Sequence, residues 1–93
     1  MKAIWNDVVI AESNETVIVE GNHYFPKESV KWDFFKPNHS HTTCPWKGVA
    51  SYYDIEIKGE VVPAAAWYYP EPKPAASMVK NRIAFWKGVI IKA

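Results

Sequence analysis

Short apolar runs separated by turn-forming residues recur along the whole chain. Residues 2–5 and 8–12 flank an Asn-Asp pair, and these two residue types tolerate the positive φ of a tight hairpin turn. A β-branched run at 16–20 leads through a glycine turn into an aromatic run at 23–25. We therefore predict an antiparallel meander in the first third of the chain.

The next segment combines a helical pattern with a strand pattern. Pro26–Ser29 is predicted to form a single helical turn, because proline is favoured at the start of a helix. Residues 30–35 nearly alternate apolar and polar side chains, which indicates a strand with one buried face, with a short helix as the alternative. Residues 36–41 contain a Pro-Asn pair and are predicted to form a loop.

Two longer strands follow, and residues 46–57 and 61–69 are predicted to pair as a hairpin across a Gly-Glu turn. Tyr52 and Tyr53 interrupt the alternation of the first strand, which indicates a bulge or a strand buried on both faces. Pro63 has no backbone donor, so it places the start of the second strand at an edge or a bulge.

A proline-rich connector separates these strands from the C-terminal elements. Pro70–Pro74 is predicted to be stiff and extended, and Ala75–Val79 to form a short helix after the last proline. Residues 82–86 and 89–92 are predicted to form a final pair of strands. The sequence thus predicts a mainly β fold of compact antiparallel sheets, or a partly open barrel or sandwich, with one or two short helical turns.

Composition defines the class of protein. With 93 residues, the chain is expected to form a single domain, 1–93, with a modest core. The net charge is +1, the charges are spread along the chain and Arg82 is the one arginine, so we expect no nucleic-acid partner. A single cysteine forms no internal disulfide, and no apolar run approaches membrane-spanning length. We therefore expect a soluble cytoplasmic protein without a membrane partner.

The central segment, residues 39–53, is the candidate site. It contains the only cysteine, two of the three histidines, a lysine between Trp46 and Gly48, and the tyrosine pair. No other segment holds as many reactive or hydrogen-bonding groups so close together in the sequence.

Lys47 is the first candidate for binding or catalysis, and Gly48 beside it allows a ligand to approach closely. An aromatic wall formed by Trp46 would remove water from the ammonium group and lower its pKa, which favours a general base or a Schiff-base lysine. In its charged form Lys47 would instead bind a carboxylate or a phosphate. The alternative is a surface lysine whose stem lies on Trp46.

Cys44 is the second catalytic candidate. A reactive thiolate needs positive charge nearby and partial exposure, and Lys47, His39 and His41 are the available cations. The favoured alternative is an inert cysteine that packs as a small hydrophobe, because free cysteine is among the most buried residue types.

His39, His41 and Cys44 are also weak candidates for a metal site. Their side chains suit zinc, but a structural zinc site normally has four protein ligands, and the fourth would have to come from a distant residue such as His23 or Asp33. Solvated loop histidines are the favoured interpretation, so we predict no metal and no cofactor.

The aromatic residues of the two long strands are predicted to face a common cavity, because pairing about the glycine turn would bring Tyr52 or Tyr53 near Trp67. Tyr69 would extend this wall, and its hydroxyl would be one of the few polar groups that a ligand pocket needs. The prolines around Glu71 would hold its carboxylate at the rim, and Glu20 before a glycine turn is a second candidate carboxylate.

Several motifs together resemble one family. They are Ala11-Glu12-Ser13, Val19-Glu20-Gly21, Tyr24-Phe25-Pro26, Thr43-Cys44-Pro45-Trp46-Lys47-Gly48, Tyr52-Tyr53, Trp67-Tyr68-Tyr69-Pro70-Glu71-Pro72 and Ile83-Ala84-Phe85. In this order they resemble an uncharacterised family of small bacterial domains, the four-twenty-seventh numbered family of unknown function, which also carries a nucleotidyltransferase-like label. The resemblance implies a compact β-rich fold and a shared pocket around the Cys-Pro-Trp-Lys-Gly segment, without an established activity. The label would predict phosphate-binding glycines and paired carboxylates, and neither has a recognisable arrangement in this sequence.

Three classes of function remain open. A domain that binds a small polar molecule in an aromatic-lined pocket around Lys47 is favoured. The first alternative is a small enzyme, a transferase or a hydrolase, that uses Lys47, Cys44 or a glutamate. The second is a protein-interaction module that docks a partner on exposed aromatic side chains.

Overall fold

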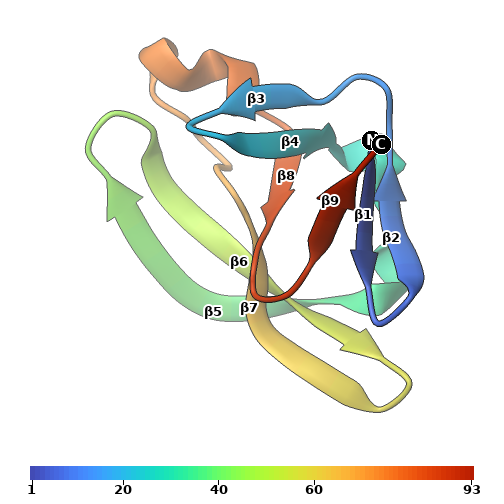
Figure 1. Cartoon of the computed structure of the whole chain (residues 1–93). Helices are drawn as coiled ribbons and strands as arrows, with labels where there is room; N and C mark the ends of the chain where they lie inside the picture. Colours follow the sequence, from blue (N-terminus) through green and yellow to red (C-terminus); the bar gives the residue numbers. More distant parts are fainter.

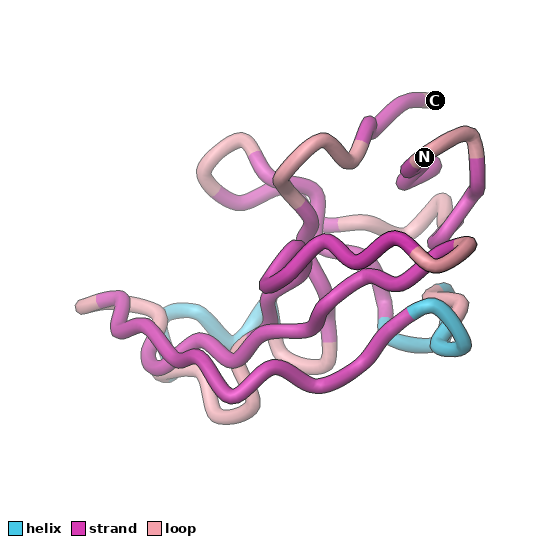
Figure 2. Tube along the Cα trace, turned by 90° about the horizontal axis from the view of Figure 1, so that it is seen from below, coloured by secondary structure: helices cyan, strands magenta, loops and turns pink.

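The computed structural model describes all 93 residues, which form two antiparallel sheets and three short 3-10 helical segments (Figure 1). The strands are β1 (Lys2–Trp5), β2 (Val8–Glu12), β3 (Val17–Val19), β4 (Asn22–Pro26), β5 (Phe35–Cys44), β6 (Gly48–Ile57), β7 (Glu60–Tyr68), β8 (Arg82–Phe85) and β9 (Ile90–Lys92). The helical segments are η1 (Lys27–Ser29), η2 (Trp32–Phe34) and η3 (Pro74–Val79). The small sheet has the order β2-β1-β9 and the large sheet the order β3-β4-β8-β7-β6-β5, and neither closes into a barrel. The predicted mainly β class is confirmed, and Figure 2 shows how little of the chain is helical.

Two predicted hairpins, β1–β2 and β6–β7, are confirmed. β1 and β2 pair across Asn6 and Asp7, whose φ angles are 49° and 62°, as expected for a turn with two left-handed residues. β6 and β7 pair across a turn in which Gly59 has a φ of 80°. The predicted bulge also occurs, because the register shifts between Tyr53 and Ile55.

Two predictions in the middle of the chain are wrong. Residues 30–34 do not form a strand: Val30 makes only an isolated bridge to Ala11, and the short-helix alternative occurs as the 3-10 turn η2. Residues 36–41 do not form a loop, because they belong to the ten-residue strand β5, which pairs with β6 from Phe35 to Cys44. This strand lies at the edge of the large sheet, where solvent satisfies polar side chains and a proline is tolerated.

Two long-range pairings also differ from the prediction. The first four strands are not one meander, because the β1–β2 hairpin lies in the small sheet and the β3–β4 hairpin in the large one. The last two strands do not pair with each other: β9 pairs with β1, whereas β8 lies between β4 and β7. Local alternation indicates a strand but does not identify a partner that is distant in the sequence.

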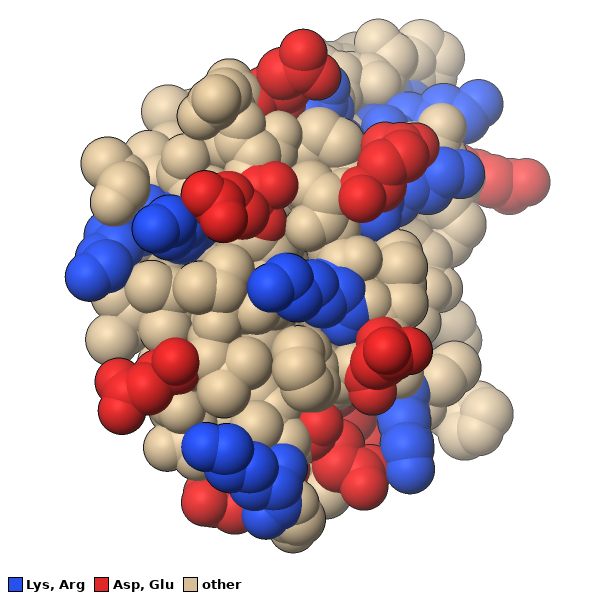
Figure 3. Space-filling view, turned by 90° about the vertical axis from the view of Figure 1, so that its right-hand side faces the viewer, with Lys and Arg blue, Asp and Glu red and all other residues tan.

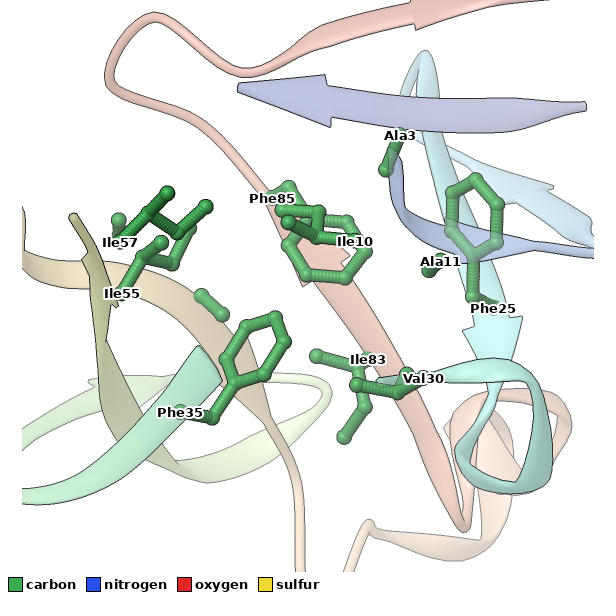
Figure 4. Close-up of a cluster of buried hydrophobic side chains, with 12 residues drawn as sticks. Ala3, Ile10, Ala11, Phe25, Val30, Phe35, Ile55, Ile57, Ile83 and Phe85 are labelled. Atoms are coloured by element: carbon green, nitrogen blue, oxygen red, sulfur yellow. The ribbon is translucent and has the colours of Figure 1, made fainter. Parts of the chain in front are cut away.

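The main core lies between the two sheets. Figure 4 shows Ile10 of the small sheet among Phe35, Ile55 and Phe85 of the large sheet, and all four side chains belong to one buried cluster. Alternation along the large sheet directs other side chains to its opposite face, where Tyr24 and Ala84 pack with Val79 of η3 in a second cluster. The large sheet is therefore covered by the small sheet on one face and partly by η3 on the other.

The surface carries mixed charge. Figure 3 shows Lys, Arg, Asp and Glu side chains interspersed over one face of the molecule. The helical segments are three to six residues long, and none of the helices has the length and apolar composition needed to cross a bilayer.

Candidate functional site

A cavity of about 190 Å³ opens on the face of the large sheet that carries η3. We name it the aromatic pocket. Its walls come from five aromatic side chains, one ion pair and one amide: Glu20, Asn22, Tyr24, Lys47, Tyr52, Trp67, Tyr69 and Trp86. The elements that contribute them are far apart in the sequence and are brought together only by the pairing of the large sheet.

The aromatic walls follow from the strand register. Tyr52 on β6 lies opposite Trp67 on β7, so the predicted adjacency of these two strands is confirmed. The Trp67 ring meets Tyr24 edge-on with the ring centroids 6.2 Å apart, and Trp67 Nε1 donates to Tyr24 Oη over 3.1 Å. The ring of Trp86 also meets that of Trp67 edge-on, with centroids 5.9 Å apart and planes inclined by 78°. These contacts hold the rings in fixed orientations around the cavity.

Lys47 is the one cationic residue that lines the pocket. It lies in the turn between β5 and β6, and only 5% of its surface is exposed. Its ammonium donates to Glu20 Oε1 in the turn between β3 and β4, so an ion pair joins two hairpin tips. The ammonium also lies 4.8 Å from the centroid of the Trp46 ring and 5.8 Å from that of Tyr69.

This environment keeps Lys47 charged. Burial lowers the pKa of Lys47, but the hydrogen bond to Glu20 and the neighbouring Tyr69 raise it, and the net pKa lies above its ordinary value. The hydrogen bond from Lys47 is the main cause of a lowered pKa for Glu20. The predicted lowering of the Lys47 pKa is therefore not found, because the effect of burial is outweighed by the hydrogen bond to the Glu20 carboxylate and by neighbouring groups such as Tyr69.

Cys44 ends β5 close to this lysine and is partly buried. It packs against the second core cluster, so the interpretation as a small hydrophobe holds for part of its surface. Burial raises the pKa of the Cys44 thiol, but the backbone N–H groups of Lys47 and Trp46 and the Lys47 ammonium outweigh it. The net pKa lies below its ordinary value, although the thiol does not line the aromatic pocket.

The two histidines of the central segment lie on β5 and are exposed. His41 Nδ1 is 3.3 Å from Ser51 Oγ, and neither ring lines the aromatic pocket. No three His, Cys, Asp or Glu side chains come close enough together to hold a metal ion.

The structure brings four of the eight predicted ligand-binding residues to the pocket: Lys47, Tyr52, Trp67 and Tyr69. The other four do not line it: Trp46, Gly48, Tyr53 and Glu71. Trp46 covers the Lys47 ammonium from outside, and Gly48 packs against the backbone of the 71–73 segment. Tyr53 points to the opposite face of the sheet and stacks on Tyr68.

Sequence reasoning missed three lining residues and undervalued a fourth. The sequence indicates Glu20 only as a second candidate carboxylate before a glycine turn, because its lysine partner is 27 positions away. Tyr24 faces the pocket because Phe25 faces the main core, which alternation along β4 would have indicated. No local signal marks Asn22 or Trp86, because long-range pairing places them.

The ion pair predicts a specific pH dependence. Glu20 has a folded-state pKa below its ordinary value of 4.5, so its pairing stabilises the fold above pH 4.5. This contribution is lost as the pH falls through the lower, folded-state pKa. Between about pH 6 and about pH 3, the wild type should therefore lose more stability than Glu20→Gln in urea titrations.

Glu71→Gln is the matched control for this prediction, because Glu71 is exposed and makes no ion pair. Its stability should follow the wild type at each pH. Equal slopes for the wild type and Glu20→Gln would show that the ion pair does not contribute.

Comparison with known families agrees with the sequence motifs. Residues 1–92 match the model of the family described as a domain of unknown function (DUF427), whose short label is NTP_transf_9. The match covers nearly the whole chain and confirms the resemblance seen in the sequence. No curated protein matches the chain.

Proposed function

The chain belongs to the DUF427 family, and we propose that its aromatic pocket binds a small, uncharged molecule with a planar ring and a polar edge. The observation that carries this proposal is the combination of five aromatic walls with a lysine that is already paired with a carboxylate. Among the three classes of function, this is the domain that binds a small polar molecule, with the ligand specified as an uncharged planar ring.

The size of the cavity supports a single ring. An apolar cavity of about 150 Å³ is large enough to take up benzene, and the aromatic pocket measures about 190 Å³. This volume leaves room for one ring with small substituents. It is below the range of about 300–1,000 Å³ that is typical for drug-sized ligands.

The polar end supports a ligand that both donates and accepts hydrogen bonds. Lys47 has three N–H donors, and only its bond to Glu20 is made. Glu20 offers a second carboxylate oxygen, and the side-chain amide of Asn22 supplies a donor and an acceptor at the same cavity. Because Lys47 and Glu20 neutralise each other, a neutral ligand avoids breaking the pair.

Binding is favoured over catalysis by the charge on Lys47. A protonated ammonium donates hydrogen bonds but is neither a base nor a nucleophile at neutral pH. The enzyme and the protein-interaction module remain the alternatives that the experiment must separate from simple binding.

Uracil is a suitable probe, since its ring is planar and uncharged and its edge carries both donors and acceptors. Dihydrouracil is the matched control ligand, because it keeps the polar edge but has a puckered ring. In ¹H–¹⁵N spectra, we expect uracil to shift the indole N–H signals of Trp67 and Trp86 saturably, and dihydrouracil to bind more weakly. At a ligand concentration of about 100 times Kd, the melting temperature should rise by roughly 10–20 °C.

Lys47→Met should weaken uracil binding by about tenfold or more, because it removes a charged donor. Lys80→Met is the matched control: Lys80 is exposed, makes no side-chain hydrogen bond and does not line the pocket. Equal binding of dihydrouracil, or no saturable shift at Trp67 and Trp86, would contradict the proposal. Turnover of the probe would favour the enzyme, and a stable protein complex without probe binding would favour the interaction module.

A further inference from the structure

A second cavity, of about 280 Å³, lies where the large sheet meets η1 and η2. We name it the basic cleft. The lining residues that define its chemistry are Lys27, Trp32, Tyr53, Tyr68 and Arg82. Tyr69 is the one residue that lines both cavities. The proposed function of the aromatic pocket makes no use of the basic cleft.

The first feature of the cleft is a group of aromatic rings. Tyr53 and Tyr68 stack with centroids 4.9 Å apart and planes inclined by 22°. Trp32 approaches Tyr53 at 5.1 Å and 62°, yet 39% of its surface stays exposed. The indole N–H of Trp32 donates to the Lys27 carbonyl over 3.0 Å, which fixes the ring at the opening. An exposed but fixed aromatic ring is well suited to contact a planar ligand.

The second feature is uncompensated positive charge. Lys27 and Arg82 line the cleft, and no Asp or Glu does. The two ion pairs of the molecule, Lys36–Glu56 and Lys47–Glu20, do not involve either cation. The ammonium of Lys27 makes no hydrogen bond, whereas Nη1 of Arg82 donates to the Glu15 and Tyr24 carbonyls, at 2.6 and 3.5 Å. Arg82 is thus held in place, and its remaining N–H groups have no partner in the protein.

We propose that the basic cleft binds a small anion that carries a planar ring, namely an aryl carboxylate or an aryl phosphate. The anionic group would lie between Lys27 and Arg82, because an anchored guanidinium and a free ammonium together match an oxyanion. The ring would contact Trp32 and the tyrosine stack. This site differs from the aromatic pocket in charge, because the cation of the pocket is paired with Glu20 and the cations of the cleft are not.

Four probes separate the parts of this proposal. Benzoate and phenyl phosphate each combine a ring with an anion, phenol has the ring alone, and inorganic phosphate has the anion alone. Titration followed by the indole N–H signals of the five tryptophans reports each site separately, because Trp32 lines the cleft, whereas Trp67 and Trp86 line the pocket. Benzoate or phenyl phosphate should shift the Trp32 signal saturably and leave those of Trp67 and Trp86 nearly unchanged. The tighter of the two identifies the preferred oxyanion.

Lys27→Glu should weaken this binding about five- to tenfold, because repulsion replaces attraction while the exposed side chain leaves the fold intact. Lys58→Glu is the matched control, since it changes the net charge equally but lines neither cavity. Binding of phenol or phosphate as tight as that of the tighter aryl anion would overturn the proposal. Equal binding of the aryl anion by Lys27→Glu and Lys58→Glu would also overturn it, as would the absence of a saturable shift at Trp32. Loss of uracil binding at Trp67 has no bearing on these outcomes, so the two sites fail independently.

Discussion

Gly48→Ala is expected to destabilise the protein by about 2–4 kcal/mol and to displace Lys47 from Glu20. Gly48 has a φ of 116°, a conformation that residues with a side chain rarely adopt. A Cβ atom at this position would lie 3.3 Å from the carbonyl oxygen of Glu71 and 3.7 Å from the backbone nitrogen of Lys73. Both neighbours are backbone atoms, so they cannot move aside as a flexible side chain would.

The close contact at Gly48 is part of the frame that holds the pocket. The backbone nitrogen of Lys73 donates to the Lys47 carbonyl over 2.9 Å, and Lys73 Nζ donates to the Pro45 carbonyl over 2.6 Å. Separation of these segments would release the turn that carries Lys47. Uracil binding at the aromatic pocket should therefore weaken together with stability in Gly48→Ala.

Gly59→Ala is the matched control for the close approach. Gly59 has a φ of 80°, but a Cβ atom there would meet nothing within 4 Å. Its replacement should destabilise by about 1–2 kcal/mol, from backbone conformation alone. Urea unfolding of the two variants measures the difference. Equal loss of stability would show that contact with the 71–73 segment does not constrain residue 48.

Those parts of the fold that depend on neighbouring residues could be predicted from the sequence. The β1–β2 turn needs two left-handed residues, and Asn6 and Asp7 supply them. Pro63 and the tyrosine pair both indicated a bulge, and the β6–β7 register shifts there. At this bulge the backbone N–H of Ala64 donates to Asp54 Oδ1 over 2.8 Å, so a side chain replaces the interrupted ladder.

The parts that depend on distant partners could not be predicted. β5 has the polar composition of a loop and is a strand only because β6 supplies the partner for eight of its ten residues. The position of β9 in the small sheet likewise depends on its pairing with β1, at the opposite end of the chain. Neither pairing leaves a pattern within a short window of sequence.

The sequence likewise predicted only part of the candidate site. Tyr52 and Trp67 were found because a single hairpin sets their register, and the structure places them opposite each other. The protonation state of Lys47 could not be predicted, because its pKa depends on Glu20 in another hairpin. Burial lowers the pKa of Lys47 and the hydrogen bond to Glu20 raises it, so one residue distant in the sequence affects the chemistry of the site.

Trp67→Ala is expected to destabilise the protein by about 3 kcal/mol and to abolish binding of uracil at the aromatic pocket. Trp67 is the centre of the wall: its ring contacts Tyr24 and Trp86, and its indole N–H satisfies the hydroxyl of the buried Tyr24. Truncation leaves a cavity in the second cluster and removes one partner of that hydrogen bond. Unfolding in urea measures the first effect, and the Trp86 indole signal reports the second.

Two further variants separate packing from recognition. Trp86→Ala removes a wall that is 47% exposed, so it should destabilise by about 1 kcal/mol or less and still weaken uracil binding about tenfold. Trp67→Phe keeps an aromatic ring but loses the hydrogen bond to Tyr24. It should retain most of the uracil binding and lower the free energy of unfolding by about 1 kcal/mol. If Trp86→Ala bound uracil like the wild type, the Trp86 ring would not contact the ligand. If Trp67→Ala also bound uracil like the wild type, the ligand would not lie in the aromatic pocket, and the cavity would be only a packing feature of the second cluster.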